Sequence, residues 1–153
     1  ALVQWAQALI NELEALFLVP GAVLYDYTDA REAAAIPRDR AAWLEGTEQV
    51  SVAYRTWAVW LQSHGEVGYA ETLLRKAMAA HAEVCRYALP MGPGVALPTS
   101  SALVPLKTFH DGWVARPRQE PALNSTNWTY LAEVGYNPFT MAFPTMPSAQ
   151  GSE

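Results

Sequence analysis

Two stretches of the chain place apolar residues at every third or fourth position. The first covers residues 2–17, where glutamine, asparagine and glutamate occupy the positions between the apolar ones. The second runs from Ser63 to about Leu89, and Ser63 and Glu66 have the spacing of a capping box at its start. This periodicity predicts two amphipathic helices. The apolar stripe of the first consists of Leu2, Trp5, Ala6, Leu9, Ile10, Leu13, Leu16 and Phe17.

Other stretches show the alternation that predicts β-strands. The strongest signal is residues 49–62, where Val50, Val52 and Tyr54 alternate with smaller or polar residues. From Trp57 onward both faces of this stretch are apolar, as in a strand that is covered on both sides. Weaker signals predict strands at residues 22–27, 103–110, 113–118 and 128–136, with a hairpin turn at Asp111-Gly112.

The order of these elements predicts an α+β fold. We expect a mostly antiparallel sheet with the two amphipathic helices packed on one face, because this layout buries the apolar side of each element. The charged residues 28–48 predict a solvated connection with a short helix, for which Thr28 is the candidate cap. Residues 1–136 are expected to form one domain, and residues 137–153 an extended or flexible C-terminal arm.

Charge is scarce in this sequence. Charged side chains make up 16% of the chain, against about 25% in an average soluble domain, and only seven lie in residues 90–153. Because the centres of subunit interfaces are depleted in charge, this scarcity predicts contact with other protein chains. The net charge of −5 argues against nucleic-acid binding, which needs a basic surface. No apolar run reaches the ~20 residues of a membrane-spanning helix, so no membrane contact is expected.

No segment carries a recognisable catalytic or cofactor-binding motif. His81 and Cys85 lie one helical turn apart, but a zinc site needs three or four protein ligands and no third lies nearby in the sequence. A single cysteine forms no internal disulfide, which favours a reducing compartment. We therefore expect no catalytic centre, metal or cofactor. The alternative is a small enzyme built on scattered residues, with His64, His81, Cys85 and Asp111 as its candidates.

Aromatic and arginine residues gather in the charge-poor C-terminal third. Tryptophan, tyrosine and arginine are the residue types that dominate binding hot spots, so this end is the candidate interface. A further alternative is a ligand- or peptide-binding module with a groove lined by Trp113 and Trp128. The candidate interface residues are Trp113, Arg116, Arg118, Trp128 and Tyr130.

The predicted elements follow a distinctive order over residues 2–136. An amphipathic helix, a short strand and a charged connection precede a long strand at Tyr54–Leu61, which leads directly into the helix at Ser63–Leu89. This order resembles the tail-terminator or tail-completion proteins of long-tailed bacteriophages, although the proline-rich residues 90–101 and the chain after Asn137 differ from that family.

The resemblance implies a structural subunit of a virion. Such a subunit forms a homo-oligomeric ring, expected to be hexameric, that caps the tail tube and joins it to neck or connector proteins of the head. It would be assembled in the host cytoplasm.

Overall fold

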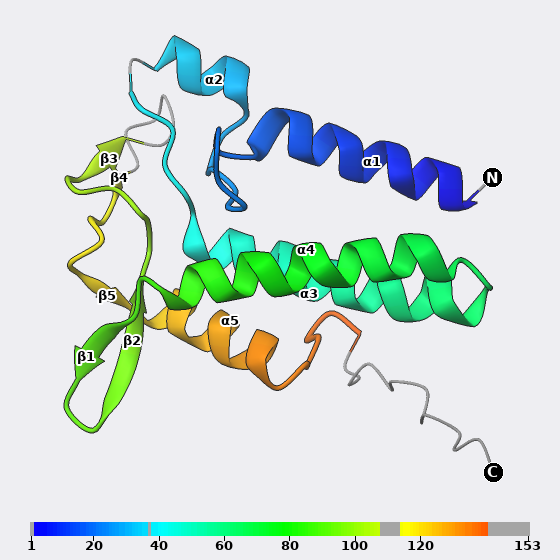
Figure 1. The fold of residues 1–153 in the computed structure, drawn as a ribbon. Coiled ribbons are helices and arrows are strands. Elements are labelled where there is room, and N and C mark those ends of the chain that lie inside the picture. The colour runs from blue at the N-terminus through cyan, green and yellow to red at the C-terminus, as the bar shows by residue number, and fades with distance from the viewer. Residues whose placement is uncertain (1, 37, 108–113, 141–153) are drawn as a thin grey trace.

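The computed structural model describes residues 2–36, 38–107 and 114–140, and this part of the chain forms helices and short antiparallel strands (Figure 1). The α+β class predicted from the sequence is confirmed. The helices are α1 (Leu2–Phe17), α2 (Ala30–Ala35), α3 (Leu44–Ser63), α4 (Val67–Cys85) and α5 (Leu123–Glu133). The strands are β1 (Leu89–Met91), β2 (Gly94–Pro98), β3 (Leu106–Lys107), β4 (Val114–Ala115) and β5 (Pro121–Ala122).

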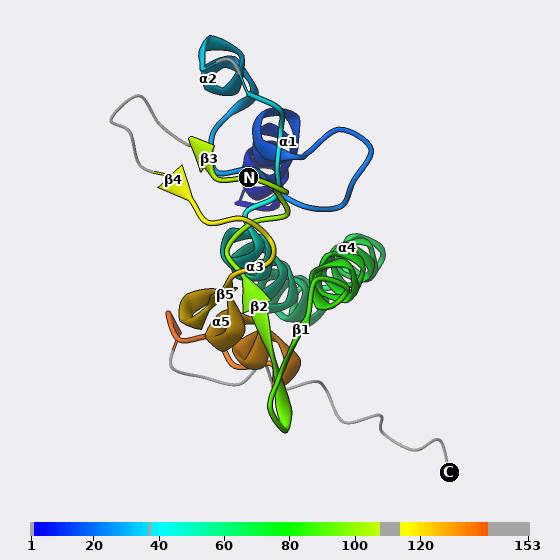
Figure 2. The ribbon, with the colours of Figure 1, turned by 90° about the vertical axis from the view of Figure 1, so that its left-hand side faces the viewer.

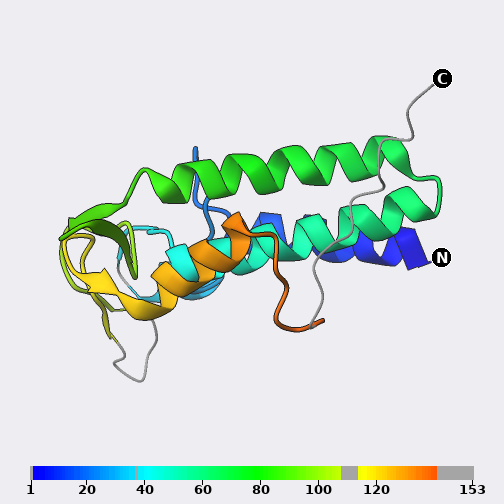
Figure 3. The same cartoon turned by 90° about the horizontal axis from the view of Figure 1, so that it is seen from below.

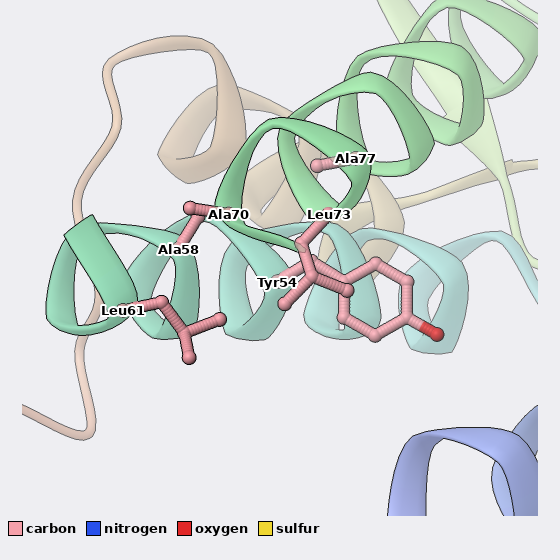
Figure 4. Close-up of a cluster of buried hydrophobic side chains, with 6 residues drawn as sticks. All are labelled: Tyr54, Ala58, Leu61, Ala70, Leu73 and Ala77. Carbon is pink, nitrogen blue, oxygen red and sulfur yellow. The ribbon is translucent and has the colours of Figure 1, made fainter. Parts of the chain in front are cut away.

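Helices α3 and α4 form an antiparallel hairpin that holds the main core. Ala58 and Leu61 of α3 face Ala70, Leu73 and Ala77 of α4, and all five are fully buried (Figure 4). The alanines allow the two helices to approach closely, since interaxial distance depends on the side chains at the contact. The helix predicted over residues 63–89 is therefore confirmed, with the shorter bounds of α4.

The turn between α3 and α4 differs from the predicted capping box. The Ser63 hydroxyl donates to the carbonyl oxygen of Trp60 at 2.7 Å, and the N-cap of α4 is Glu66, which makes no side-chain capping bond. Gly65 has φ +82° in this turn, a conformation that glycine adopts without a steric penalty. The capping-box prediction is wrong because Ser63 still belongs to the last turn of α3.

The strand predicted over residues 49–62 is wrong, because this stretch belongs to α3. The buried positions of α3 follow a helical period, but they include Thr47, Glu48 and Ser51, each with 0% exposure. Polar residues at buried positions hide the 3.6-residue period and leave an apparent alternation of the valines. Each buried polar group needs a partner, and the Ser51 hydroxyl donates to the carbonyl oxygen of Ala77 at 3.0 Å.

The strand predicted over residues 128–136 is also wrong, since most of it lies in α5. This helix turns Ser125, Thr129 and Ala132 toward the rest of the molecule. These small residues lie four and three positions apart, the spacing of one helix face. They carry little apolar signal, so the helical period of the segment was not visible in its hydrophobic pattern.

Polar contacts attach the C-terminal end of α5 to α3. The Arg55 guanidinium donates to the carbonyl oxygen of Ala132 at 2.5 Å, at the helix end where carbonyl groups lack intrahelical partners of the regular kind. The Asn137 side-chain amide donates to the Thr56 hydroxyl at 2.8 Å. These bonds fix the position at which α5 ends.

The strands form two small antiparallel sheets, with the order β1-β2-β5 in one and the pair β3-β4 in the other. The pairing of Leu106 with Ala115 agrees with the hairpin predicted between residues 103–110 and 113–118, although each strand has only two residues. The turn predicted at Asp111-Gly112 lies outside the described residues. The strand predicted at residues 22–27 is reduced to two isolated bridges, at Tyr25 and Asp26.

The charged connection is more ordered than a solvated linker. Asp29, and not Thr28, caps α2: its carboxylate accepts two backbone N–H groups of the first turn at 2.8 Å each. Thr28 is buried instead. Arg38 and Arg40 fold back onto Asp26, whose side chain is fully buried, so several of the charges predicted to be solvated form an internal ion-pair cluster.

The helices are arranged around α3. α1 and α5 lie on opposite sides of it (Figures 1 and 2), and the view from below shows α4 and α5 both running beside it (Figure 3). Helices therefore pack mainly on one another, and the sheets lie at one end of the helical hairpin. The sequence pattern instead predicts that the two helices pack on one face of a single sheet. No helix in the described part of the chain is both long and apolar enough to cross a membrane.

Candidate functional site

An apolar groove lies between α1 and α3. Its volume is about 490 Å³, and its lining is almost entirely apolar. The wall formed by α3 includes Val50, Ala53 and Trp57. The wall formed by α1 consists of Leu2, Trp5, Ala6, Leu9, Ile10 and Leu13.

Part of the apolar face of α1 is not covered by the rest of the chain. Ala6 is the only residue of this helix that is buried, whereas Leu2, Trp5 and Leu9 are 55%, 62% and 50% exposed. These three residues lie at spacings of three and four, so they form one stripe along the helix. No residue between 2 and 11 is charged. A contiguous exposed apolar surface of this kind typically marks an interaction site.

A chain of polar contacts holds α1 against the α3–α4 hairpin. The Glu14 carboxylate accepts hydrogen bonds from Lys76 Nζ, at 2.6 and 2.7 Å, and from the Tyr54 hydroxyl, at 2.9 Å. The Tyr54 hydroxyl in turn lies 2.9 Å from the Tyr25 hydroxyl. Because the Tyr54 hydroxyl donates its hydrogen to Glu14, the Tyr25 hydroxyl is the donor in this pair, and burial raises the pKa of Tyr25 to about 12. The network ties the C-terminal half of α1 to α3 and α4.

A second cluster of functional groups joins α3, α4 and α5. His81 Nδ1 lies 2.9 Å from Glu48 Oε1, and His81 Nε2 lies 2.7 Å from Glu133 Oε2. Glu48 is fully buried, whereas the Glu133 side chain is 72% exposed. The hydrogen bond with Glu48 raises the pKa of His81, and burial lowers it. The negative charge of Glu48 and the hydrogen bond with Glu133 also raise this pKa, whereas the positive charge of Arg55 lowers it. A protonated His81 donates from both ring nitrogens and satisfies both carboxylates.

The stability of the protein is expected to fall as pH rises through the raised pKa of His81. The ordinary pKa of this group is 6.5, so its contribution to stability is fully present below pH 6.5 and is lost progressively as pH rises from there through the raised pKa of the folded state. Urea unfolding of the wild type and of His81→Gln across this range measures the effect, since glutamine keeps an N–H donor but does not titrate. A wild-type curve that runs parallel to that of His81→Gln would show that the ion pair contributes nothing.

The structure brings together only two of the four residues that are candidates for a catalytic site, His81 and Cys85. Cys85 Sγ lies 3.7 Å from His81 Nε2, whereas His64 precedes α4 and stacks on Trp60, and Asp111 lies outside the described residues. Burial raises the pKa of the Cys85 thiol, and the carboxylates near it act in the same direction. A thiol held in its protonated form is a weak nucleophile. Among the residues that the structure describes, no three His, Cys, Asp or Glu side chains are grouped so as to hold a metal ion.

The interface residues predicted from the sequence are spread over different places. Arg116 is exposed and pairs with Glu120 at 3.7 Å, in a hollow shared with the start of α5. Arg118 lines a separate hollow beside the end of α4. Tyr130 is 65% exposed, whereas Trp128 is half-buried against Phe139, with ring centroids 5.6 Å apart. Trp113, the fifth candidate, lies outside the part of the chain that the structure describes, so a groove between it and Trp128 is not defined.

The prediction from sequence missed the groove itself. Leu2, Trp5 and Leu9 were placed on the apolar face of the first helix, and such a face normally packs on the protein's own core. The available signal was the run of residues 2–11 without a single charge.

Comparison with known proteins gives no relative: no protein-family model, curated protein or solved structure matches this chain.

Proposed function

We propose that this protein is a structural assembly subunit that associates with further copies of itself through the groove between α1 and α3. The exposed stripe of Leu2, Trp5 and Leu9 beside this groove carries the proposal. A short amphipathic helix gains most of its stability from packing its apolar face, and α1 leaves Leu2, Trp5 and Leu9 of that face at least half exposed within its own chain. A partner that fills the groove supplies the missing packing.

The energy available at this surface is moderate. Full burial of a large apolar side chain contributes roughly 1.5–3 kcal/mol, so covering three side chains that are about half exposed contributes on the order of 3 kcal/mol. Association also costs several kcal/mol of lost translational and rotational freedom. The partner must therefore contact the α3 wall as well, where Val50 and Trp57 are half-buried.

A second copy of this chain fits the chemistry of the groove. Charge is absent from residues 2–11, so a copy that carries the same net charge of −5 meets no carboxylate there. The chain also has other exposed apolar residues outside α1 that a neighbouring copy could cover, as the charge-poor composition predicts.

The role in a bacteriophage tail remains a prediction and is not needed for this proposal. The resemblance to tail-terminator proteins depends on a long strand at Tyr54–Leu61, and this stretch is helical. The hexameric ring, the tail-tube and neck partners and the place in a virion are therefore predictions from the sequence pattern. Self-association is supported by the groove instead.

The double substitution Trp5→Ser with Leu9→Ser is expected to abolish self-association, because it removes two of the three residues of the exposed stripe. Light scattering coupled to size-exclusion chromatography should give a mass for the wild type that increases with concentration, and a mass near 16.8 kDa for the variant. Met78→Ser is a matched control, since Met78 is 64% exposed on α4 and does not line the groove.

Two results would contradict the proposal. One is a wild type that stays monomeric at the highest concentration that can be reached. The other is a control variant that dissociates as fully as the double variant, which would place the contact elsewhere. Thermal unfolding followed by circular dichroism confirms that each variant is folded.

A further inference from the structure

One face of helix α5 is apolar and exposed, whereas Trp128 and Leu131 beside it are half-buried. Leu123, Tyr130 and Val134, the last of them just after the helix, are 74%, 65% and 41% exposed. They lie at spacings of seven and four residues, which places them on one face. The opposite face, against the molecule, consists of Ser125, Thr129 and Ala132. A surface helix of a monomer normally has the reverse arrangement, with its apolar side inward.

The inward face of α5 gains little from burial. The hydroxyl oxygens of Ser125 and Thr129 are buried without a hydrogen-bond partner within the described residues. Burying such a group unpaired is unfavourable. Polar contacts at both ends position α5 instead: Thr126 accepts from the backbone N–H of Leu97, and Arg55 and His81 contact the C-terminal end. The outward apolar face is therefore free to bind another protein.

Two uncovered apolar surfaces of the described residues match in length. One is the concave groove beside α1, and the other is the convex face of α5. Leu2 and Leu13 are separated by the same number of residues as Leu123 and Val134, which corresponds to about 16 Å of helix in each case. An apolar helix face that fits into an apolar groove is a common mode of protein recognition.

We propose that α5 of one copy occupies the α1–α3 groove of the next copy, so that the subunits join head to tail. This inference rests on the proposed function and names the element that fills the groove. α1 and α5 lie on opposite sides of α3 (Figures 1 and 2), so one copy can contact a different neighbour on each side. A contact between two different surfaces generates a ring where the rotation closes and a filament where it does not.

The charges favour one orientation of α5 in the groove. The only charged residue of α5 is Glu133, at its C-terminal end, and the charged residues of α1 are Glu12 and Glu14, near its own C-terminal end. An antiparallel arrangement of the two helices keeps these carboxylates apart and brings Glu133 to the N-terminal end of α1, where the helix dipole is positive. A parallel arrangement would place like charges together.

A complementation experiment tests this arrangement. The groove variant carries Trp5→Ser and Leu9→Ser, and the helix variant carries Leu123→Ser and Tyr130→Ser. Each variant alone lacks one of the two surfaces and is expected to be monomeric. In an equal mixture, the intact groove of the helix variant binds the intact α5 of the groove variant. Native mass spectrometry of the mixture should therefore show a one-to-one pair with twice the single-chain mass of 16.8 kDa.

Each outcome decides between this inference and the proposed function. If the helix variant still assembles like the wild type while the groove variant is monomeric, α5 does not fill the groove, although self-association through the groove stands. A mixture that contains only monomers also overturns the head-to-tail arrangement. A wild type that is monomeric throughout removes the proposed function itself. All four substituted residues are at least half exposed, so the variants are expected to fold.

Discussion

Replacement of Asp26 by alanine is expected to lower the free energy of unfolding by about 3–5 kcal/mol, because it removes one partner from a buried ion-pair cluster. Asp26 Oδ1 lies 2.6 Å from Arg38 Nη2, and Asp26 Oδ2 lies 2.8 Å from Arg40 Nε. The side-chain exposures of Arg38 and Arg40 are only 5% and 17%. Without the carboxylate, the two guanidinium groups are left close together and largely shielded from water.

The loss extends beyond the ion pairs. The backbone N–H of Ala41 donates to Asp26 Oδ2 at 3.1 Å, so a buried peptide group also loses its partner. Arg40 in addition donates to the carbonyl oxygen of Leu16, at the C-terminal end of α1, at 3.1 Å. Asp26 therefore holds the connection and the end of α1 in place, and Asp26→Ala is expected to weaken self-association through the groove as well.

Urea unfolding at neutral pH measures this effect. Asp39→Ala is the matched control, since Asp39 is exposed and lies next to the same arginine residues, and a surface substitution of this kind usually changes stability by less than ~0.5 kcal/mol. If Asp26→Ala and Asp39→Ala have equal stabilities, the cluster is not the structural element described above.

The substitution Leu73→Ala is expected to destabilise the protein by about 2–5 kcal/mol, since it deletes apolar groups from a fully buried position and leaves a cavity. Leu73 has 0% exposure and lies between α3 and α4 with Leu61 and Tyr54 (Figure 4). The neighbouring core residues include Ala58, Ala70 and Ala77, whose short side chains cannot move to fill the cavity. The loss comes from missing packing and transfer free energy, so it should be independent of pH between about 5 and 8.

The denaturant midpoint is the quantity to compare for this variant. An unchanged slope with a lower midpoint indicates lost stability without a change in the surface exposed on unfolding. Leu103→Ala removes the same atoms from a residue that is 62% exposed, and its midpoint should stay close to that of the wild type. A midpoint for Leu73→Ala that matches Leu103→Ala would mean that the α3–α4 contact is not the main core.

Elements with apolar residues on their buried side were predictable from the sequence. α4 and α1 have such a stripe, and both were predicted close to their actual bounds. α3 and α5 were predicted as strands because their buried positions include Thr47, Ser51 and Thr129, which carry no hydrophobic signal. Burial of these side chains depends on partners that are distant in the chain, such as the carbonyl oxygen of Ala77 for Ser51.

The composition of the sequence predicted that an interface exists, but not where it lies on the fold. A shortage of charge and an excess of aromatic residues indicated contact with other chains, and both are properties of the sequence. Which apolar residues are uncovered depends on the fold. Leu2, Trp5 and Leu9 have the pattern of core residues, yet α1 packs on the core through Val3 and Ile10 and leaves these three exposed.

Local periodicity was therefore sufficient for the two helices with an apolar stripe, because a side chain's direction along a helix follows from its position in the chain. The burial of a side chain could not be predicted from local periodicity, because it depends on which distant segments of the chain pack against it. The packing of α5 on α3 through serine, threonine and alanine turns the apolar side of α5 outward, and this arrangement creates the second surface of the proposed assembly.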